Sequence, residues 1–378
     1  MRIAIDYTPG IVQRAGIGRY TRNLVQALIE ADHTDQFTLF SSERATSTYP
    51  FPRAANVRPR VVGVGNRNAT IIWQRLNLPL PAELVMGRAD VLHGPDYILP
   101  PALNTPRVVT IHDLAFLTNP ECALPSLVEY LTRVTPRAIR RADRVIAVSQ
   151  RTADDLVERL RVPREKIRVI HLGVDSAFNP GRDPTQEERL RKRLGITQPF
   201  LLAVGTIEPR KNYEGLIAAF ARATRMPDGP PLLVIVGRKG WLYDGVFAAV
   251  DTYDVRDRVL FLDFVADGDL PTLYHAATAL AMPSIYEGFG IPVVEAMASG
   301  TPVICSDTGP LPEIAGDAAR LVPVGDVDAL ANGLRDLFAD DTMRQRLRER
   351  GLARARLFSW TDAARKHLEV YREVARRH

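Results

Sequence analysis

Short apolar runs alternate with longer amphipathic stretches along almost the whole chain. The first half holds seven such runs, near Ile3 and at 37–40, 57–62, 91–93, 108–111, 145–148 and 169–171. The second half holds six more, at 200–204, 232–236, 259–262, 280–282, 303–305 and 320–322. Runs that are apolar throughout are typical of parallel strands covered on both faces, and the stretches between them have helical spacing. The pattern therefore predicts an α/β fold with two doubly wound parallel sheets.

A segment without periodicity separates the two sets of strands. Residues 175–184 carry two prolines and a glycine, which indicate a hinge. The length of 378 residues also suggests two domains of roughly 150–200 residues. We expect a first domain at 1–176 and a second at 177–360. Helical spacing near the end of the chain predicts a last helix, 361–378, that packs back on the first domain.

Composition limits the class of protein. Cys122 and Cys305 lie among apolar neighbours, so we expect buried thiols in place of a disulfide or zinc ligands. The seven histidines show no metal-ligand spacing. No stretch reaches the roughly 18 apolar residues of a membrane span, and the chain opens with a strand-like segment unlike a signal peptide. We expect a cytoplasmic protein without a metal site.

The positive charge lies in the first half of the chain. Residues 1–180 hold 23 Lys and Arg against 17 Asp and Glu, whereas the remainder holds 26 against 27. Five arginines of the first half have a spacing that favours one side of a helix: Arg133, Arg137, Arg140, Arg141 and Arg144. They are a solvated face or a surface for peripheral contact with anionic membrane lipid or an acidic acceptor. Nucleic acid is disfavoured as a partner because no aromatic residues interleave with these arginines.

A glycine-rich loop in the second half has two glutamates on its flanks. Glu287 lies in the loop that follows the run at 280–282, and Glu295 lies in the predicted helix that begins near Pro292 and ends at Gly300. The N–H groups at a helix start and the positive end of its dipole attract anions. This loop is therefore a candidate phosphate site, to which Ser284, Gly288, Phe289, Gly290 and Ile291 would contribute.

Basic residues follow a neighbouring strand of the second half. Arg210 and Lys211 come after the run at 200–204, with Asn212 as a helix N-cap. The carboxyl ends of parallel strands share one edge of a sheet, so we expect both cations near the Glu287 loop. Alone they would be a solvated helix start, but together with the loop they predict a diphosphate site.

The first half offers weaker signals. Gly16 and Gly18 open a helix after the first strand, but the third glycine of a dinucleotide motif is replaced by Thr21, which disfavours a nicotinamide dehydrogenase. The two glycines either allow a close backbone approach or form a turn. His112 and Asp113 follow the strand at 108–111 and are candidate catalytic residues. A buried structural role for the histidine is the alternative.

These motifs together resemble the retaining glycosyltransferases of family 4, which have the GT-B fold of two Rossmann-like domains. The most specific part is E-G-F-G-x-P-x-x-E-A-M-A, which spans Glu287 to Ala298. The resemblance implies that Glu287 binds hydroxyls of the donor sugar, that the loop amides bind its diphosphate, and that Glu295 binds the ribose. It assigns further roles to Lys211 at the diphosphate, Gly16 on the acceptor side, His112 near the sugar, and Phe264 and Val265 at the nucleobase.

The resemblance implies metal-independent transfer of a sugar from a nucleotide diphosphate to a glycan or lipid-linked acceptor. Many family members carry arginine where this chain has Thr206, so a second diphosphate cation would come from Arg210. The variant Gly-Thr-x-Glu-Pro-Arg-Lys-Asn is similar to that of bacterial polysaccharide mannosyltransferases, which suggests GDP-mannose. The pairs Asp267/Asp269 and Asp326/Asp328 are expected to be N-cap turns. A sugar-nucleotide epimerase or hydrolase and a non-catalytic nucleotide-sugar-binding module stay open as alternatives.

Overall fold

The computed structural model describes residues 1–13, 16–46, 49–62, 81–263 and 265–377. The chain divides into two compact units. The first unit comprises Met1–Leu117, Ser126–Gly173 and Ser359–His378, and the second comprises Thr118–Pro125 and Val174–Phe358. The segment 175–184 thus belongs to the second unit.

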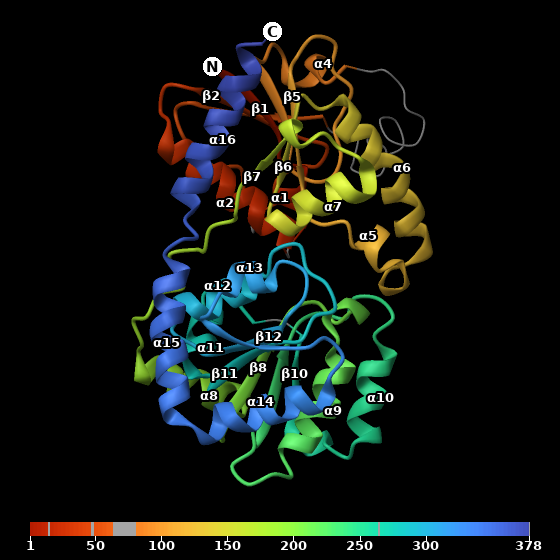
Figure 1. The fold of residues 1–378 in the computed structure, drawn as a ribbon. Helices are drawn as coiled ribbons and strands as arrows, with labels where there is room; N and C mark the ends of the chain where they lie inside the picture. The colour runs from red at the N-terminus through yellow and green to blue at the C-terminus, as the bar shows by residue number, and fades with distance from the viewer. Residues whose placement is uncertain (14–15, 47–48, 63–80, 264, 378) are drawn as a thin grey trace. The chain divides into compact units, whose positions relative to one another are not determined.

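The first unit is built on a parallel sheet of seven strands in the order β3-β2-β1-β4-β5-β6-β7 (Figure 1). The strands are β1 (Arg2–Asp6), β2 (Gln36–Ser41), β3 (Val57–Val61), β4 (Val91–Gly94), β5 (Arg107–Ile111), β6 (Arg144–Ala147) and β7 (Ile167–Val169). Because β1 pairs with both β2 and β4, the strand order reverses there, which makes the carboxyl ends of β1 and β4 a topological switch point.

Helices connect these strands. They are α1 (Thr8–Val12), α2 (Gly16–Ala31), α4 (Glu83–Met86), α5 (Ala115–Thr118), α6 (Pro125–Arg141), α7 (Gln150–Leu160) and the last helix, α16 (Trp360–Ala375). A short 3-10 turn, Arg164–Lys166, precedes β7. Local sequence explains the start of α7, where the Ser149 hydroxyl accepts a hydrogen bond from the Thr152 N–H at 3.1 Å.

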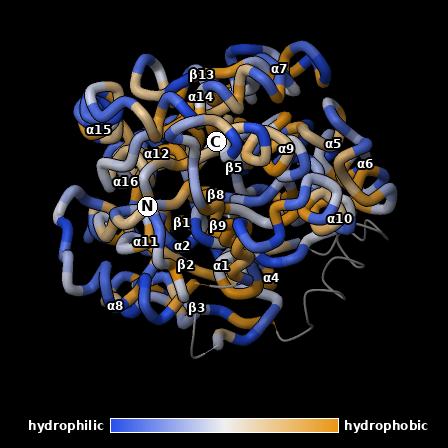
Figure 2. The backbone as a smooth tube through the Cα atoms, turned by 90° about the horizontal axis from the view of Figure 1, so that it is seen from below, coloured by the Kyte–Doolittle hydropathy of each residue, from blue (hydrophilic) through white to orange (hydrophobic). Residues whose placement is uncertain are grey.

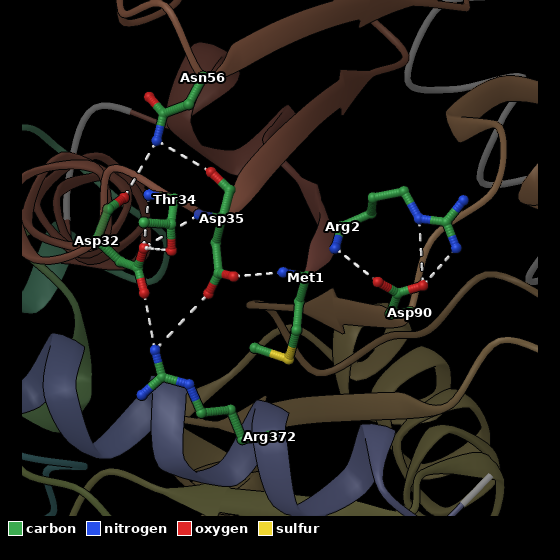
Figure 3. Close-up of polar contacts among 8 residues, drawn as sticks. All are labelled: Met1, Arg2, Asp32, Thr34, Asp35, Asn56, Asp90 and Arg372. Atoms are coloured by element: carbon green, nitrogen blue, oxygen red, sulfur yellow. Dashed lines mark hydrogen bonds and ion pairs between the residues drawn. The ribbon is translucent and has the colours of Figure 1, made fainter.

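The last helix belongs to the first unit. α16 packs beside α2 (Figure 1), and its buried polar side chains bond to the sheet and to α2. The imidazole of His367 lies 3.0 Å from the hydroxyl of Tyr20, and the hydroxyl of Tyr371 lies 2.8 Å from the imidazole of His93. Figure 3 shows Arg372 donating to Asp32 at 2.7 Å. These contacts attach α16 to the sheet of the first unit, which contains the first strand of the chain.

The second unit repeats the architecture with six parallel strands in the order β10-β9-β8-β11-β12-β13. The strands are β8 (Phe200–Val204), β9 (Leu232–Val236), β10 (Val259–Leu262), β11 (Ala279–Met282), β12 (Val303–Ser306) and β13 (Ala319–Val322). Its helices are α8 (Pro184–Leu194), α9 (Tyr213–Ala223), α10 (Asp244–Thr252), α11 (Leu270–Ala276), α12 (Ile291–Ala298), α13 (Leu311–Ala315), α14 (Val327–Ala339) and α15 (Asp341–Ala355). Three 3-10 turns lie at Pro120–Cys122, Pro209–Lys211 and Arg256–Arg258.

Burial follows the predicted pattern in the second unit. β8 and β9 are apolar and largely buried, whereas α8 is predominantly hydrophilic (Figure 2). Cys305 is fully buried in β12 and Cys122 is buried, and both are free thiols. The apolar runs therefore predicted the strands of both sheets correctly, with β7 beginning two residues before the expected run.

One prediction about the basic residues is wrong. Arg144 does not share the helix of Arg133, Arg137, Arg140 and Arg141, because α6 ends at Arg141 and Arg144 is the first residue of β6. The β-branched residues Val145 and Ile146 begin the buried strand there, and this apolar run overrides the helical spacing of the arginines.

Candidate functional site

The predicted site of the second unit lies at the switch point of its sheet. β8 pairs with both β9 and β11, so the loops after β8 and β11 leave the sheet from neighbouring carboxyl ends. The two loops are tied together, since the Ile285 N–H donates to the Arg210 carbonyl at 2.8 Å and the Asn212 side chain donates to the Pro283 carbonyl at 3.2 Å. Asn212 occupies the N-cap position of α9, as expected, but its side chain joins the loops and does not cap the helix.

Arg210, Lys211, Glu287 and Glu208 form one charge cluster, which we call the Glu287 cluster; its two carboxylates are buried and its two cations are half-buried. The Lys211 ammonium lies 2.6 Å from one carboxylate oxygen of Glu287, and the Arg210 guanidinium lies 2.9 Å from the other. Arg210 also bonds Glu208 at 2.7 Å and the carbonyl of Tyr286 at 3.0 Å. The expectation that both cations lie beside the Glu287 loop is met by direct ion pairs.

The electrostatics of this cluster fix the charge of Glu287. Burial alone would raise the pKa of its carboxyl, but the positive charges of Arg210 and Lys211 outweigh burial and lower the pKa to about 2. Burial and the neighbouring carboxylates of Glu287 and Glu208 raise the pKa of the Tyr213 hydroxyl, which donates to the Gly205 carbonyl at 3.1 Å. The site therefore presents an ionised carboxylate held in place by two cations.

The start of α12 adjoins this cluster in sequence. Gly290 adopts φ of +98° at the N-cap, a conformation that side-chain-bearing residues rarely take. Pro292 has no N–H, and the N–H of Val293 donates to the Gly290 carbonyl at 2.9 Å. Donation to an anion at this helix start would therefore come from Ile291 and the preceding loop.

The other predicted residues of the second unit are mostly buried. Glu295 accepts a hydrogen bond from the Tyr274 hydroxyl at 2.9 Å. Ser284 is buried, and its hydroxyl contributes to lowering the pKa of Glu287. The ring of Phe289 packs edge-on against Phe358 with centroids 5.6 Å apart, so its backbone is the part available to a ligand.

The proposed nucleobase segment follows β10, two strands away from the switch point. Val265 is buried. Phe264 lies outside the described residues. Gly288 is buried within the loop between Glu287 and Phe289.

His112 follows β5 in the first unit and is buried. Its Nε2 lies 2.7 Å from the carbonyl of Pro95, and because a carbonyl only accepts, Nε2 carries the proton. Burial lowers the pKa of the imidazole, and the ring of Tyr20 packs edge-on against it at 4.7 Å. His112 is thus a neutral, oriented histidine whose Nδ1 is the acceptor.

Asp113 lies beside it at the start of α5. Its carboxylate accepts a hydrogen bond from the Ala115 N–H at 3.0 Å, and its own N–H donates to the Tyr97 hydroxyl at 3.2 Å. These bonds give Asp113 a structural function in the loop. A catalytic role for this residue stays a prediction.

The two glycines of the first unit differ in what surrounds them. A side-chain carbon on Gly18 would lie 1.8 Å from the carbonyl oxygen of Gln13, whereas one on Gly16 would meet nothing within 4 Å. Close backbone packing therefore accounts for Gly18 without a ligand. Space remains beside Gly16.

Three residues of these regions were missed by the sequence analysis. Glu208 is buried against Arg210, and Tyr274 bonds Glu295. Asp96 follows β4 at the first switch point and accepts a hydrogen bond from Gln13 at 2.7 Å. Burial and the carboxylates of Asp6 and Asp113 raise the pKa of Asp96 to about 6. Its position directly after an apolar strand was the available signal.

The acidic pairs considered as metal motifs precede helices. Asp326 caps α14 through a 2.8 Å bond from the Ala329 N–H, as expected. Asp269 occupies the N-cap position of α11, but its carboxylate pairs with Arg193 at 2.6 Å and does not cap the helix. Among the described residues, no helix has the length and apolar character needed to cross a membrane.

Comparisons with known proteins identify the family. Residues 14–178 match the model described as Glycosyltransferase Family 4, and residues 186–354 match Glycosyl transferases group 1. O-antigen chain mannosyltransferase B of Escherichia coli is 30% identical over 98% of this chain and 100% of that protein. D-inositol 3-phosphate glycosyltransferase of Salinispora arenicola is 29% identical over 97% of this chain and 89% of that protein.

Solved structures share the fold. Sucrose-phosphate synthase of Thermosynechococcus elongatus superimposes with a TM-score of 0.80 at 24% identity over all of both chains. Anabaena HepE in complex with UDP and glucose gives a TM-score of 0.73 at 21% identity, covering 99% of this chain and 100% of the other. The chain therefore belongs to the glycosyltransferases of family 4, and its two parallel sheets are those of the GT-B fold.

Proposed function

We propose that the protein transfers a mannosyl group from GDP-mannose to a glycan or lipid-linked acceptor, with retention at the anomeric carbon and without a metal ion. The observation that carries the proposal is the Glu287 cluster, which sits at a switch point beside the start of α12. The choice of mannose rests on the relative in Escherichia coli, whose name describes a mannosyltransferase.

The pairing within the cluster suggests a different role for each of the two cations. Arg210 donates to Glu208, Glu287 and the Tyr286 carbonyl, which occupies much of its guanidinium. Lys211 has three N–H donors, one of which bonds Glu287. In our proposal Lys211 and the amides at the start of α12 bind the diphosphate, while Arg210 orients Glu287 toward the sugar hydroxyls.

Charge development explains why this arrangement suits glycosyl transfer. As the bond from the anomeric carbon to the phosphate oxygen breaks, negative charge grows on the leaving diphosphate, and preorganised donors stabilise it. A double displacement would need a carboxylate nucleophile under the anomeric carbon. Glu287 is engaged by two cations, so we propose attack of the acceptor on the same face, with its proton passing to the leaving phosphate oxygen.

Product analysis tests the proposal. The protein is incubated with GDP-mannose, UDP-glucose or ADP-glucose in EDTA, with and without glycan and lipid-linked acceptors. Release of GDP that depends on an acceptor and yields an α-linked product is the expected result. Acceptor-independent release of sugar would favour a hydrolase, and loss of turnover in EDTA would contradict metal independence.

A further inference from the structure

The first unit has a strongly basic pocket at the edge of its sheet opposite the predicted acceptor residues. It measures about 630 Å³ and lies where β5, β6 and β7 begin and where α6 ends. His112 follows the carboxyl end of β5, whereas Arg107 is its first residue, so roughly 15 Å of strand separates them. The pocket is therefore distinct from the switch point of this sheet.

Basic side chains dominate the lining of the pocket. They come from the starts of three strands and the ends of two helices: Arg107, Arg140, Arg141, Arg144, Lys166, Arg168 and Arg377. The acidic residues that line it are Asp143 and Glu165. One further carboxylate, Glu373, pairs with Arg144 at 2.5 Å, Arg168 at 3.1 Å and Arg377 at 2.8 Å. Three guanidinium groups thus share a single counter-charge.

Two buried donors of the lining lack a partner. Within the residues that the structure describes, the Nε atoms of Arg107 and Arg144 are buried and have no hydrogen-bond acceptor. Arg144 is 7% exposed, so water does not readily satisfy it. A buried donor without an acceptor destabilises the fold, and an anion bound in the pocket would supply an acceptor.

The cations also repel one another. Burial and the charges of Arg144 and Arg107 lower the pKa of Lys166, against the opposing effect of Asp143. Burial and the charges of Arg107, Arg137 and Arg140 lower the pKa of Arg141. The C-terminal end of a helix favours cations and would account for Arg140 and Arg141. It also accounts in part for Lys166, whose ammonium donates to the Arg140 carbonyl of α6 at 3.4 Å. It does not account for Arg107, which lies at the start of β5.

We propose that this pocket is a binding site for a phosphate-type oxyanion with at least two negative charges. Guanidinium groups bind phosphate oxygens through paired, charge-assisted hydrogen bonds, and several converge here. The site is independent of the proposed donor site, because its residues belong to the first unit. A free phosphate compound and a lipid phosphate headgroup offer the same chemistry, and the test distinguishes them.

Calorimetric titration of the full chain with inorganic pyrophosphate in 50 mM salt tests the site. The test variant is Arg140→Gln/Lys166→Gln, with Arg140→Gln alone as a milder version. Arg133→Gln is the matched control, since Arg133 is exposed on the same helix and does not line the pocket. Lys211→Ala removes the cation of the proposed donor site, where pyrophosphate would also bind.

We expect the double variant to weaken pyrophosphate binding by about tenfold or more, which corresponds to ~1.4 kcal/mol. Arg133→Gln and Lys211→Ala should retain the pyrophosphate binding that depends on the pocket. When pyrophosphate is added to the wild type, amide hydrogen exchange should slow in peptides from 140–144 and 164–169. Co-sedimentation with vesicles of phosphatidylcholine and phosphatidylglycerol that the same variant abolishes would assign the site to a lipid headgroup. Its absence would assign the site to a soluble phosphate. Equal pyrophosphate affinity in wild type and double variant would overturn the proposal.

Discussion

The change Glu287→Gln tests the electrostatic account of the Glu287 cluster. It keeps the shape of the side chain and removes its charge, so Lys211 loses the carboxylate at 2.6 Å while Arg210 keeps Glu208. The environment lowers the pKa of Glu287 from 4.5 to about 2, and at about 1.4 kcal/mol for each unit of pKa this is worth roughly 3 kcal/mol. Removal of one partner from a buried pair costs a similar amount, about 3–5 kcal/mol.

The lowered pKa of Glu287 also predicts how stability changes with pH. A carboxyl whose pKa is lower in the folded state stabilises that state above its unfolded pKa, and the contribution disappears as protons bind on acidification. The difference in opening free energy between wild type and Glu287→Gln should therefore be full at pH 7 and shrink between pH 4.5 and pH 2. The double change Lys211→Met/Glu287→Gln should lower the opening free energy by less than the sum of the two single changes, because the two side chains contact each other.

Hydrogen exchange measured by mass spectrometry is the suitable assay, because peptides from β8 and β11 report on the second unit alone. Glu188→Gln is the matched control, since Glu188 is exposed on α8 and its loss should change the opening free energy by less than about 0.5 kcal/mol. The reasoning is refuted if Glu287→Gln and Glu188→Gln give the same opening free energy at pH 7, or if the gap persists unchanged at pH 2.5.

Four further outcomes follow from the described contacts. Lys211→Ala should lower kcat by about 100-fold with donor saturating, as for loss of one preorganised donor, and near-normal turnover would exclude Lys211 from the diphosphate site. Gly18→Ala should destabilise the first unit by about 1–3 kcal/mol in thermal unfolding because its side chain would clash with a backbone carbonyl, whereas Gly16→Ala should leave the melting temperature unchanged. Burial lowers the pKa of His367 to about 4, so the unfolded state binds the proton at a higher pH than the folded state does. The stability of the first unit should therefore fall by roughly 3 kcal/mol between pH 6.5 and pH 4. Hydrogen exchange of α16 should show this loss in the wild type and not in His367→Gln. Ser149→Ala should cost about 1 kcal/mol in urea unfolding through loss of the α7 cap, and no change would contradict the capping role.

Sequence patterning predicted the two sheets well because their central strands are buried on both faces and read as apolar runs. The edge strand β3 is mostly exposed and carries two arginines, so its apolar signal is weaker. It also placed Arg210 and Lys211 beside the Glu287 loop, because the carboxyl ends of parallel strands share an edge. It could not predict that Glu208 would compete for Arg210, since the pairing depends on side-chain directions in a 3-10 turn.

Long-range contacts were also beyond the sequence. The raised pKa of Asp96 comes from carboxylates that follow other strands, Asp6 and Asp113. The basic pocket draws on residues as far apart as Arg107 and Arg377. The spacing of the arginines suggested a single helix face and missed that Arg144 starts a strand. Helical spacing alone does not show where a helix ends, and here α6 ends at Arg141.

The most direct test of the central claim is a crystal structure of the protein with GDP. The account predicts that the diphosphate lies within hydrogen-bonding distance of the Lys211 ammonium and the N–H of Ile291, and that the ribose lies beside Glu295. A diphosphate bound away from the start of α12, with the Lys211 ammonium still bound only to Glu287, would contradict it.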